Sequence, residues 1–157
     1  MAVFEDRLRH AIHKLKYRRL AALAEPLGDA MARFYLQSPL PADMIVPVPL
    51  HPRRQRDRGY NQAALLANRL GRATCLPVRP AALIRVRATV AQMSLNAAQR
   101  KENVDGAFRC DDLTVRGQHV LLIDDVCTTG ATLDACAVAL KMAGAAEVRG
   151  LTLARTA

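Results

Sequence analysis

The sequence contains no tryptophan, few aromatic residues and no long apolar run. Aromatic residues make up 4% of the 157 residues and hydrophobic residues 51%, so the core is expected to be aliphatic. No apolar run reaches the ~20 residues that cross a bilayer. Charged residues interrupt the apolar positions at the N-terminus, where a signal peptide would need a continuous apolar stretch. We therefore expect a cytoplasmic protein with no membrane partner.

Cysteine is also scarce. The four cysteines, Cys75, Cys110, Cys127 and Cys136, are widely spaced, and none belongs to a C-x-x-C pair. This spacing argues against a disulfide framework and against a zinc site. The cysteines are expected to serve as small hydrophobic residues of the core.

Acidic residues are rare in the first two thirds of the chain. Residues 1–101 carry 18 Lys and Arg against 6 Asp and Glu, whereas residues 102–157 carry 5 against 8. Between Arg58 and Lys101 there is no acidic residue. This part of the chain presents a positive field that suits phosphates or nucleic acid. A solvated basic surface would have the same composition.

The hydrophobic pattern predicts a single α/β domain. Apolar residues at helical spacing indicate helices, and short apolar runs between polar residues indicate buried strands. Helices are expected over 4–17, 20–34, 61–72 and 130–143, and strands over 44–48, 78–86, 106–109, 119–124 and 148–153. Loops are expected over 49–58 and 87–103. The alternation is typical of a central, mostly parallel sheet flanked by helices, with a helical section over 1–41 and the core over 42–157.

The segment VLLIDDVCTTGAT, residues 120–132, carries the clearest chemical signal. Its apolar residues predict a buried strand that presents Asp124 and Asp125 at its carboxyl end, where open α/β sheets bind ligands. The threonines and Gly130 lead into a helix, whose free N–H groups and dipole form an anion site. Acceptors for hydroxyls beside donors for a phosphate suit a ribose 5-phosphate.

Two other kinds of phosphate site are excluded by their missing motifs. The ATP-binding pattern G-x-x-x-x-G-K-[ST] is absent, and so is the dinucleotide-binding pattern G-x-G-x-x-G. The alternative interpretation of segment 120–132 is an ordinary strand, loop and helix with capping Asp and Thr residues.

Segment 120–132 resembles the phosphoribosyl-diphosphate motif of type I phosphoribosyltransferases, and the wider sequence resembles the ComF family of that superfamily. The wider resemblance is carried by LKYRR (15–19), VPVPLHPRRQRDRGYNQA (46–63) and TVAQMSLNAAQRKENVDGAF (89–108). It implies a type I phosphoribosyltransferase-like fold. Many members begin with a four-cysteine zinc module that has no counterpart in this sequence, so functions that depend on that module are not carried over.

The resemblance implies roles for the residues of the motif. Asp124 and Asp125 would hold the ribose hydroxyls and, together with the diphosphate of the ligand, would contribute to binding Mg²⁺, the expected cofactor. The residues expected to hold the 5-phosphate are Thr128, Thr129, Gly130, Ala131 and Thr132.

Two further segments are implied in the site. Arg53 and Arg54 would pair with the diphosphate, because a guanidinium group binds phosphate bidentately; a solvated basic loop is the alternative interpretation. The loop over 87–103 would close over the ligand and exclude water. Within it Gln92 would bind the ligand, and Arg100 would act with the two acids in catalysis; a disordered insertion is the alternative.

Two functions follow as hypotheses. The first is a pentosyl transferase that moves the phosphoribosyl group of 5-phosphoribosyl diphosphate to an acceptor, with residues 1–41 as a hood; no motif identifies the acceptor. The second is a non-catalytic competence protein for DNA uptake that keeps the ribose-phosphate site and binds single-stranded DNA. The scarcity of aromatic residues predicts weak, non-specific DNA binding. A second copy of the chain is a further expected partner.

Overall fold

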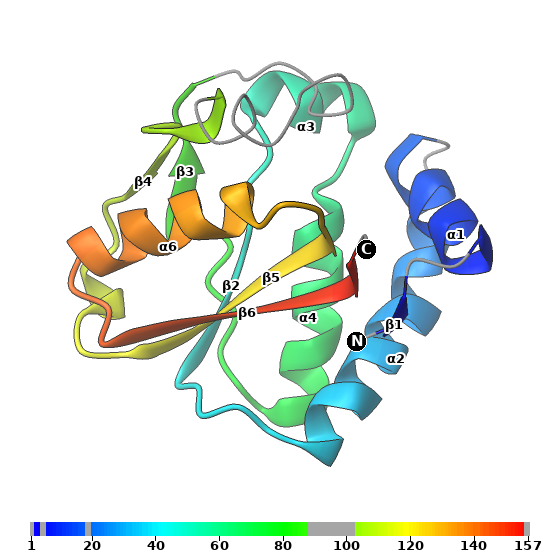
Figure 1. Ribbon diagram of the computed structural model, residues 1–157, viewed down its shortest axis with the longest axis horizontal. Coiled ribbons are helices and arrows are strands. Elements are labelled where there is room, and N and C mark those ends of the chain that lie inside the picture. Colours follow the sequence, from blue (N-terminus) through cyan, green and yellow to red (C-terminus); the bar gives the residue numbers. More distant parts are fainter. Residues whose placement is uncertain (1, 4–5, 18–19, 88–102, 156–157) are drawn as a thin grey trace.

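The centre of the molecule is a four-stranded parallel sheet with the strand order β1–β6–β5–β2 (Figure 1). The computed structural model describes residues 2–3, 6–17, 20–87 and 103–155. The strands of this sheet are β1 (Ala2–Val3), β2 (Met44–Pro47), β5 (His119–Cys127) and β6 (Glu147–Arg155). The predicted α/β fold with a parallel sheet is confirmed.

Strand β5 is an interior strand of the sheet and contributes residues to both hydrophobic cores. Its residues from Val120 to Ile123 are at most 1% exposed, because β2 and β6 pair with it on either side. Successive side chains of a strand point to opposite faces, so Leu121 and Ile123 join one core while Val120 and Leu122 join the other. This explains why the strand is a continuous apolar run.

One face of the sheet is covered by α1 (Asp6–Tyr17), α2 (Ala24–Gln37) and α4 (Gln62–Thr74). Helices α2 and α4 pack closely, because Gly28 faces Arg69 and a Cβ at Gly28 would lie only 2.6 Å from the Cβ of Arg69. The Arg69 guanidinium donates to Asp29 through Nε at 2.6 Å and Nη2 at 3.1 Å. The N-terminal residues therefore pack directly on the core and add a strand to its sheet.

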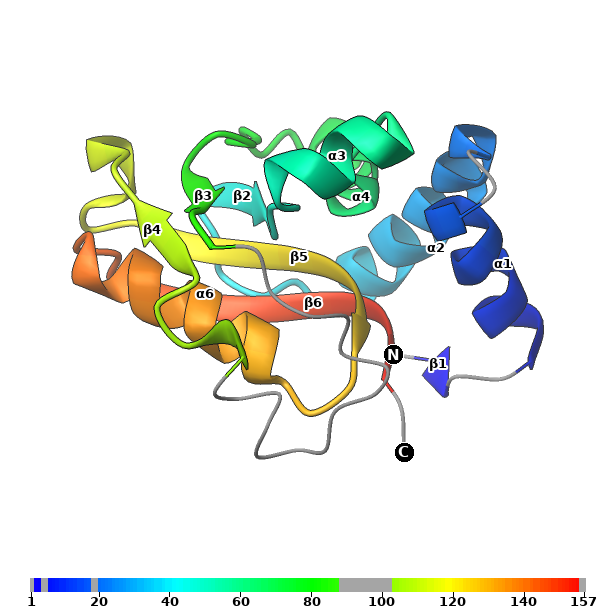
Figure 2. The ribbon, with the colours of Figure 1, turned by 90° about the horizontal axis from the view of Figure 1, so that it is seen from above.

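The other face is covered by α6 (Ala131–Met142) and by a small antiparallel pair, β3 (Leu83–Arg85) and β4 (Phe108–Cys110). Figure 2 shows α6 and α4 on opposite sides of the sheet. The core on this face is aliphatic except for Phe108. The molecule thus has three layers, as the alternation of strands and helices predicts.

A short helix, α3 (Pro52–Arg58), lies where the sequence predicts a loop. The prediction over 49–58 is wrong for these residues, because a polar helix of this length has no apolar periodicity. Its boundary signals are nevertheless regular. His51 Nδ1 accepts from the backbone N–H of Arg53 at 3.3 Å, a proline follows at the first position, and Gly59 ends the helix with φ +87°.

Other boundaries differ from the predicted ones. Of the strand expected over 78–86, only Leu83–Arg85 is a strand, and Val78 makes an isolated parallel bridge to Ile45. Strand β5 runs three residues past the predicted end at Asp124, so both acids lie within its last four residues. The helix expected over 20–34 begins with a 3-10 turn, Ala21–Leu23, and a second such turn is formed by Leu113–Val115.

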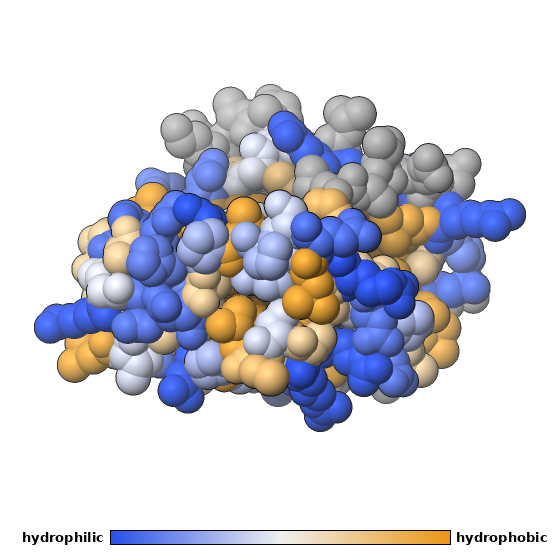
Figure 3. All heavy atoms as spheres, turned by 90° about the horizontal axis from the view of Figure 1, so that it is seen from below, coloured by the Kyte–Doolittle hydropathy of each residue, from blue (hydrophilic) through white to orange (hydrophobic). Residues whose placement is uncertain are grey.

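The surface of the described residues is mixed in character. None of the helices in this part of the chain combines the length and the apolar composition needed to cross a membrane. On the face drawn in Figure 3, hydrophobic side chains are scattered among hydrophilic ones. The most exposed large apolar residues are Met142 at 84% and Leu113 at 65%. Single exposed apolar residues of this kind are normal for a protein surface.

Candidate functional site

The two motif acids lie together near the carboxyl end of β5. Asp125 is 2% exposed, whereas Asp124 is half-buried. The Oδ1 atom of Asp124 accepts a hydrogen bond of 2.8 Å from the backbone N–H of Asp125. The strand therefore delivers both carboxylates to the sheet edge at which parallel sheets bind ligands, as the sequence predicts.

Helix α1 brings a cation to this pair of acids. The Lys16 Nζ atom lies 2.9 Å from Oδ2 of Asp125, and the two side chains are 24% and 3% exposed. Figure 1 and Figure 2 both place α1 beside the carboxyl ends of β5 and β6. Sequence reasoning missed this contact, although Lys16 belongs to the LKYRR run, because nothing local links residues 16 and 125.

The environment of Asp124 disfavours its charged form. Burial raises the pKa of Asp124 above its ordinary value, the neighbouring Asp125 raises it further, and Lys16 opposes the shift. Two adjacent carboxylates at a buried strand end repel each other, so the pair is predisposed to bind a cation or a hydrogen-bond donor. A ribose hydroxyl and a divalent metal ion are ligands of these two kinds.

The loop after β5 opens helix α6 at Gly130. This glycine is the N-cap residue and has φ +86°, in the left-handed region. Its carbonyl accepts from the N–H of Asp134 at 2.9 Å, and Oγ1 of Thr129 lies 3.4 Å from the N–H of Ala131. The hydroxyls and the first N–H groups of α6 are thus grouped at one helix end, where the dipole favours an anion. The structure brings the predicted residues 128–132 together in this way.

Basic residues approach the same edge from the segment after β2 and from β3. Arg85 of β3 is 8% exposed, and its guanidinium lies 5.2 Å from the centre of the Phe108 ring. Burial lowers the pKa of Arg85, the charge of Arg54 lowers it further, and Asp124 opposes this. Arg54 and Asp124 are therefore both electrostatic neighbours of Arg85.

The structure places only some of the predicted ligand-binding and catalytic residues of these two segments near the acids. Arg54 is near it, Arg53 is exposed on α3, and Gln92 and Arg100 lie outside the described residues. The sequence analysis missed Arg85. An arginine inside an otherwise apolar strand segment, AALIRV, is the signal that could have revealed it.

The acids fit Mg²⁺ as partial ligands. Among the described residues no cluster of three or more His, Cys, Asp or Glu side chains could hold a metal by itself. Mg²⁺ is usually held by one or two carboxylates together with the phosphates of a ligand. Asp124 and Asp125 supply such carboxylates, so their chemistry suits a metal that arrives with a diphosphate.

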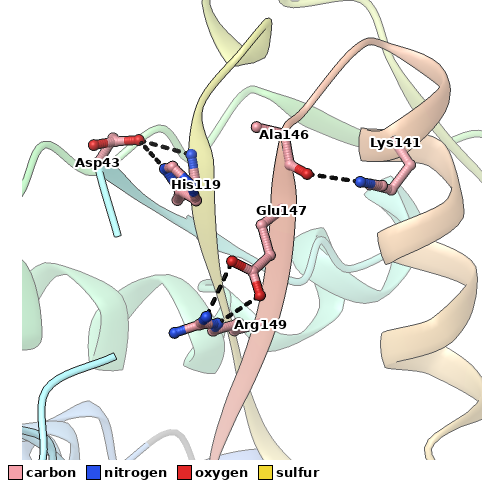
Figure 4. Close-up of polar contacts among 6 residues, drawn as sticks. All are labelled: Asp43, His119, Lys141, Ala146, Glu147 and Arg149. Carbon is pink, nitrogen blue, oxygen red and sulfur yellow. Dashed lines mark hydrogen bonds and ion pairs between the residues drawn. The ribbon is translucent and has the colours of Figure 1, made fainter. Parts of the chain in front are cut away.

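The opposite edge of the sheet carries polar contacts of a structural kind (Figure 4). Oδ2 of Asp43 accepts from the backbone N–H of His119 at 2.7 Å, and Arg149 donates to both oxygens of Glu147 at 2.8 and 3.0 Å. Hydrogen bonds from these partners lower the pKa values of Asp43 and Glu147. The contacts fix the starts of β5 and β6 and offer no strained or unpaired group.

A groove of about 650 Å³ lies beside the carboxyl end of α4, with Arg72, Cys75 and Val78 among its lining residues. None of the residues that line it is acidic, and none belongs to segment 120–132. It therefore lacks the combination of acceptors and anion-binding groups found at the end of β5.

Comparisons with known proteins show which family the chain resembles. Residues 57–157 match the family model of the phosphoribosyl transferase domain. The chain is 40% identical over 151 residues to the DNA utilization protein YhgH of Salmonella typhi, which covers 92% of this chain and 66% of that protein. It is 39% identical over 141 residues to competence protein F of Haemophilus influenzae, covering 87% and 58%. The chain thus spans about two thirds or less of the length of these relatives.

A solved structure has the same fold. The glutamine phosphoribosylpyrophosphate amidotransferase of Bacillus subtilis, complexed with ADP and GMP, matches with a TM-score of 0.59. The match covers 83% of this chain and 26% of that chain at 21% identity. At this identity the likeness concerns the fold alone.

Proposed function

Because the chain belongs to the ComF-like members of the type I phosphoribosyltransferase family, we propose that it binds 5-phosphoribosyl diphosphate with Mg²⁺ and transfers the phosphoribosyl group to an acceptor. One observation carries this proposal. The two acids of β5, the loop that opens α6 and the Arg54–Arg85 pair lie at one edge of the sheet. We place the protein in the cytoplasm, where such sugar phosphates are used.

Each part of the site has a task in this reaction. Asp124 and Asp125 accept hydrogen bonds from the ribose hydroxyls, and residues 128–132 donate to the 5-phosphate. Arg54 and Arg85 stabilise the negative charge that grows on the departing diphosphate. Arg53, next to Arg54 in α3, would add to this stabilisation. Mg²⁺, held by the diphosphate and by the two acids, would add to this charge stabilisation.

Closure and acceptor binding complete the proposal. Gln92 and Arg100, on the segment between β3 and β4, would cover the ligand and exclude water from the cation-like sugar. Residues 1–41 would form the hood on the acceptor side, since α1 already contacts Asp125 through Lys16.

A second candidate function rests on a different observation. Relatives of this chain are named as DNA utilization and competence proteins, and residues 1–101 carry three times as many basic as acidic residues. The chain would then bind single-stranded DNA and keep the ribose-phosphate site without catalysis. With few aromatic platforms for base stacking, such binding would be weak, non-specific and steeply salt-dependent.

One pair of measurements separates the two functions. The melting temperature is measured with 5-phosphoribosyl diphosphate and Mg²⁺, and separately with a single-stranded oligonucleotide at two salt concentrations. Both functions keep the ribose-phosphate site, so both predict a shift with the sugar phosphate that persists in salt and exceeds the shift with Mg²⁺ and diphosphate alone. The first function predicts that the shift with the oligonucleotide disappears at the higher salt concentration. A submicromolar affinity for the oligonucleotide that survives physiological salt would favour the second.

A further inference from the structure

The ion pair between Lys16 and Asp125 connects the N-terminal helix to the part of the chain that matches the family model. The matched domain begins at residue 57, so Lys16 lies outside it. The Nζ–Oδ2 distance of 2.9 Å is that of a direct ion pair, and the carboxylate is almost completely buried. Burying a charged carboxylate away from water raises the free energy of the folded state unless a partner of opposite charge compensates it. Lys16 is such a partner, placed on one of the two motif acids.

The position of Lys16 is fixed by the residues around it. Ile12 is 2% exposed and Leu15 fully buried, so the apolar stripe of α1 is part of the core. The Tyr60 hydroxyl donates a hydrogen bond to the backbone carbonyl of Leu15. Because Tyr60 follows α3, this bond also ties α1 to the segment that carries Arg54. The lysine therefore reaches Asp125 from an anchored helix.

The contact leaves Asp125 able to bind a ligand. An ionised carboxylate has two oxygens and about four acceptor positions, so one ammonium group on Oδ2 does not saturate it. The ammonium lies 2.9 Å from Oδ2, so a contact from α1 helps to orient the carboxylate. It also opposes the repulsion between Asp125 and Asp124, whose pKa it lowers.

We propose that Lys16 is a positioning residue of the sugar site, which orients the Asp125 carboxylate so that it accepts hydrogen bonds from the ribose hydroxyls. This inference rests on the proposed ribose-phosphate site and extends it to a residue of the N-terminal helix. The site is then incomplete without α1. Selectivity for the ribose depends on Lys16, whereas affinity for the phosphate depends on the loop over 128–132.

The test compares three probes by calorimetry: ribose 5-phosphate, 2-deoxyribose 5-phosphate and inorganic phosphate. The Lys16→Met variant is expected to lose about tenfold in affinity for ribose 5-phosphate, because a hydrogen bond to a charged group is weakened. Its affinity for inorganic phosphate should stay the same, so its preference for ribose over deoxyribose should collapse. A purely structural role for Lys16 would lower the affinity for all three probes together.

Matched variants sharpen the comparison. Lys16→Arg keeps the positive charge and should retain most of the preference for ribose 5-phosphate over 2-deoxyribose 5-phosphate, whereas Lys16→Gln should lose it. Lys14→Met is the control, since two residues on a helix are separated by about 200° and Lys14 points away from Lys16. It should bind all three probes as the unmodified protein does.

The outcomes distinguish this inference from the proposed function. If the unmodified protein prefers ribose 5-phosphate and Lys16→Met keeps that preference, the inference is wrong and the site stands. If the unmodified protein binds ribose 5-phosphate no better than inorganic phosphate, the proposed sugar site itself is wrong, and the inference falls with it. If Lys16→Met unfolds, the comparison of Lys16→Gln with Lys16→Arg decides in the same way.

Discussion

The side-chain amide of Asn61 donates a hydrogen bond of 2.9 Å to the backbone carbonyl of Val48, while its oxygen accepts one of 3.0 Å from the N–H of Ala63. One side chain thus caps α4 and holds the residue that follows β2. The N–H of Val48 in turn donates to the carbonyl of Ile123 at 2.9 Å, directly before the motif acids. Asn61 therefore links the start of α4 to Val48, which is bonded to the residue directly before the motif acids.

Replacement of Asn61 by alanine should lower the free energy of unfolding by about 1–2 kcal/mol, since it removes both a helix cap and a tie between elements. Urea denaturation measures this loss. Asn68→Ala, at an exposed position of the same helix, should cost much less. Equal losses for the two variants would contradict the role given to Asn61.

We expect phosphate to raise the melting temperature of the protein, and replacement of Gly130 by alanine to abolish this shift. Gly130 has φ +86° at the N-cap of α6, so a side chain there is strained by roughly 1–2 kcal/mol and the loop must shift. Gly117→Ala is a matched control, because Gly117 has φ +70° and open space around it but lies at the other sheet edge. Both variants should have a lower melting temperature than the unmodified protein in buffer without phosphate. A phosphate-induced shift that survives in Gly130→Ala would contradict the anion site.

The stability of the protein should fall as the pH rises from the ordinary carboxyl range, near pH 4, toward neutrality. Burial and the charge of Asp125 raise the pKa of Asp124 in the folded state. A carboxyl group whose pKa is higher in the folded state takes up a proton on folding. When the pH rises above the pKa that the group has in the unfolded state, this proton uptake becomes unfavourable and the free energy of unfolding falls. Asp124→Asn should flatten this decline, whereas Asp43→Asn should not, because hydrogen bonds from His119 lower the pKa of Asp43. If the melting temperatures of Asp124→Asn and of the unmodified protein changed with pH in the same way, the raised pKa of Asp124 would be contradicted.

The strands and helices of the core could be predicted because their apolar patterns are strong. The run from Val120 to Ile123 is buried on both faces and reads as a strand without further context. Helix α3 was missed because its residues, PRRQRDR, contain no apolar side chain. Its signals are local instead: the cap at His51, a proline at the first position and Gly59 at the end.

The site was predicted where it is continuous in sequence and missed where it is assembled in space. Asp124, Asp125 and residues 128–132 lie in one segment, so their spacing carries the chemistry. Lys16 and Arg85 reach the same edge from α1 and β3. Their positions depend on how α1 packs on the core and how β3 pairs with β4, which single-sequence patterns do not determine. The sequence therefore points to the acids and the loop as candidate site residues, but not to the cations that flank them.

The most direct test of the sugar-phosphate site is calorimetric titration of the Asp124→Asn, Asp125→Asn double variant with ribose 5-phosphate and with inorganic phosphate. In the proposed site the acids bind the ribose hydroxyls and the loop binds the phosphate, so the variant should lose at least tenfold for ribose 5-phosphate, given about 1.5–3 kcal/mol for each hydrogen bond to a charged group. Its affinity for inorganic phosphate should be unchanged or higher. Equal losses for the two ligands would contradict a ribose-phosphate site at the end of β5.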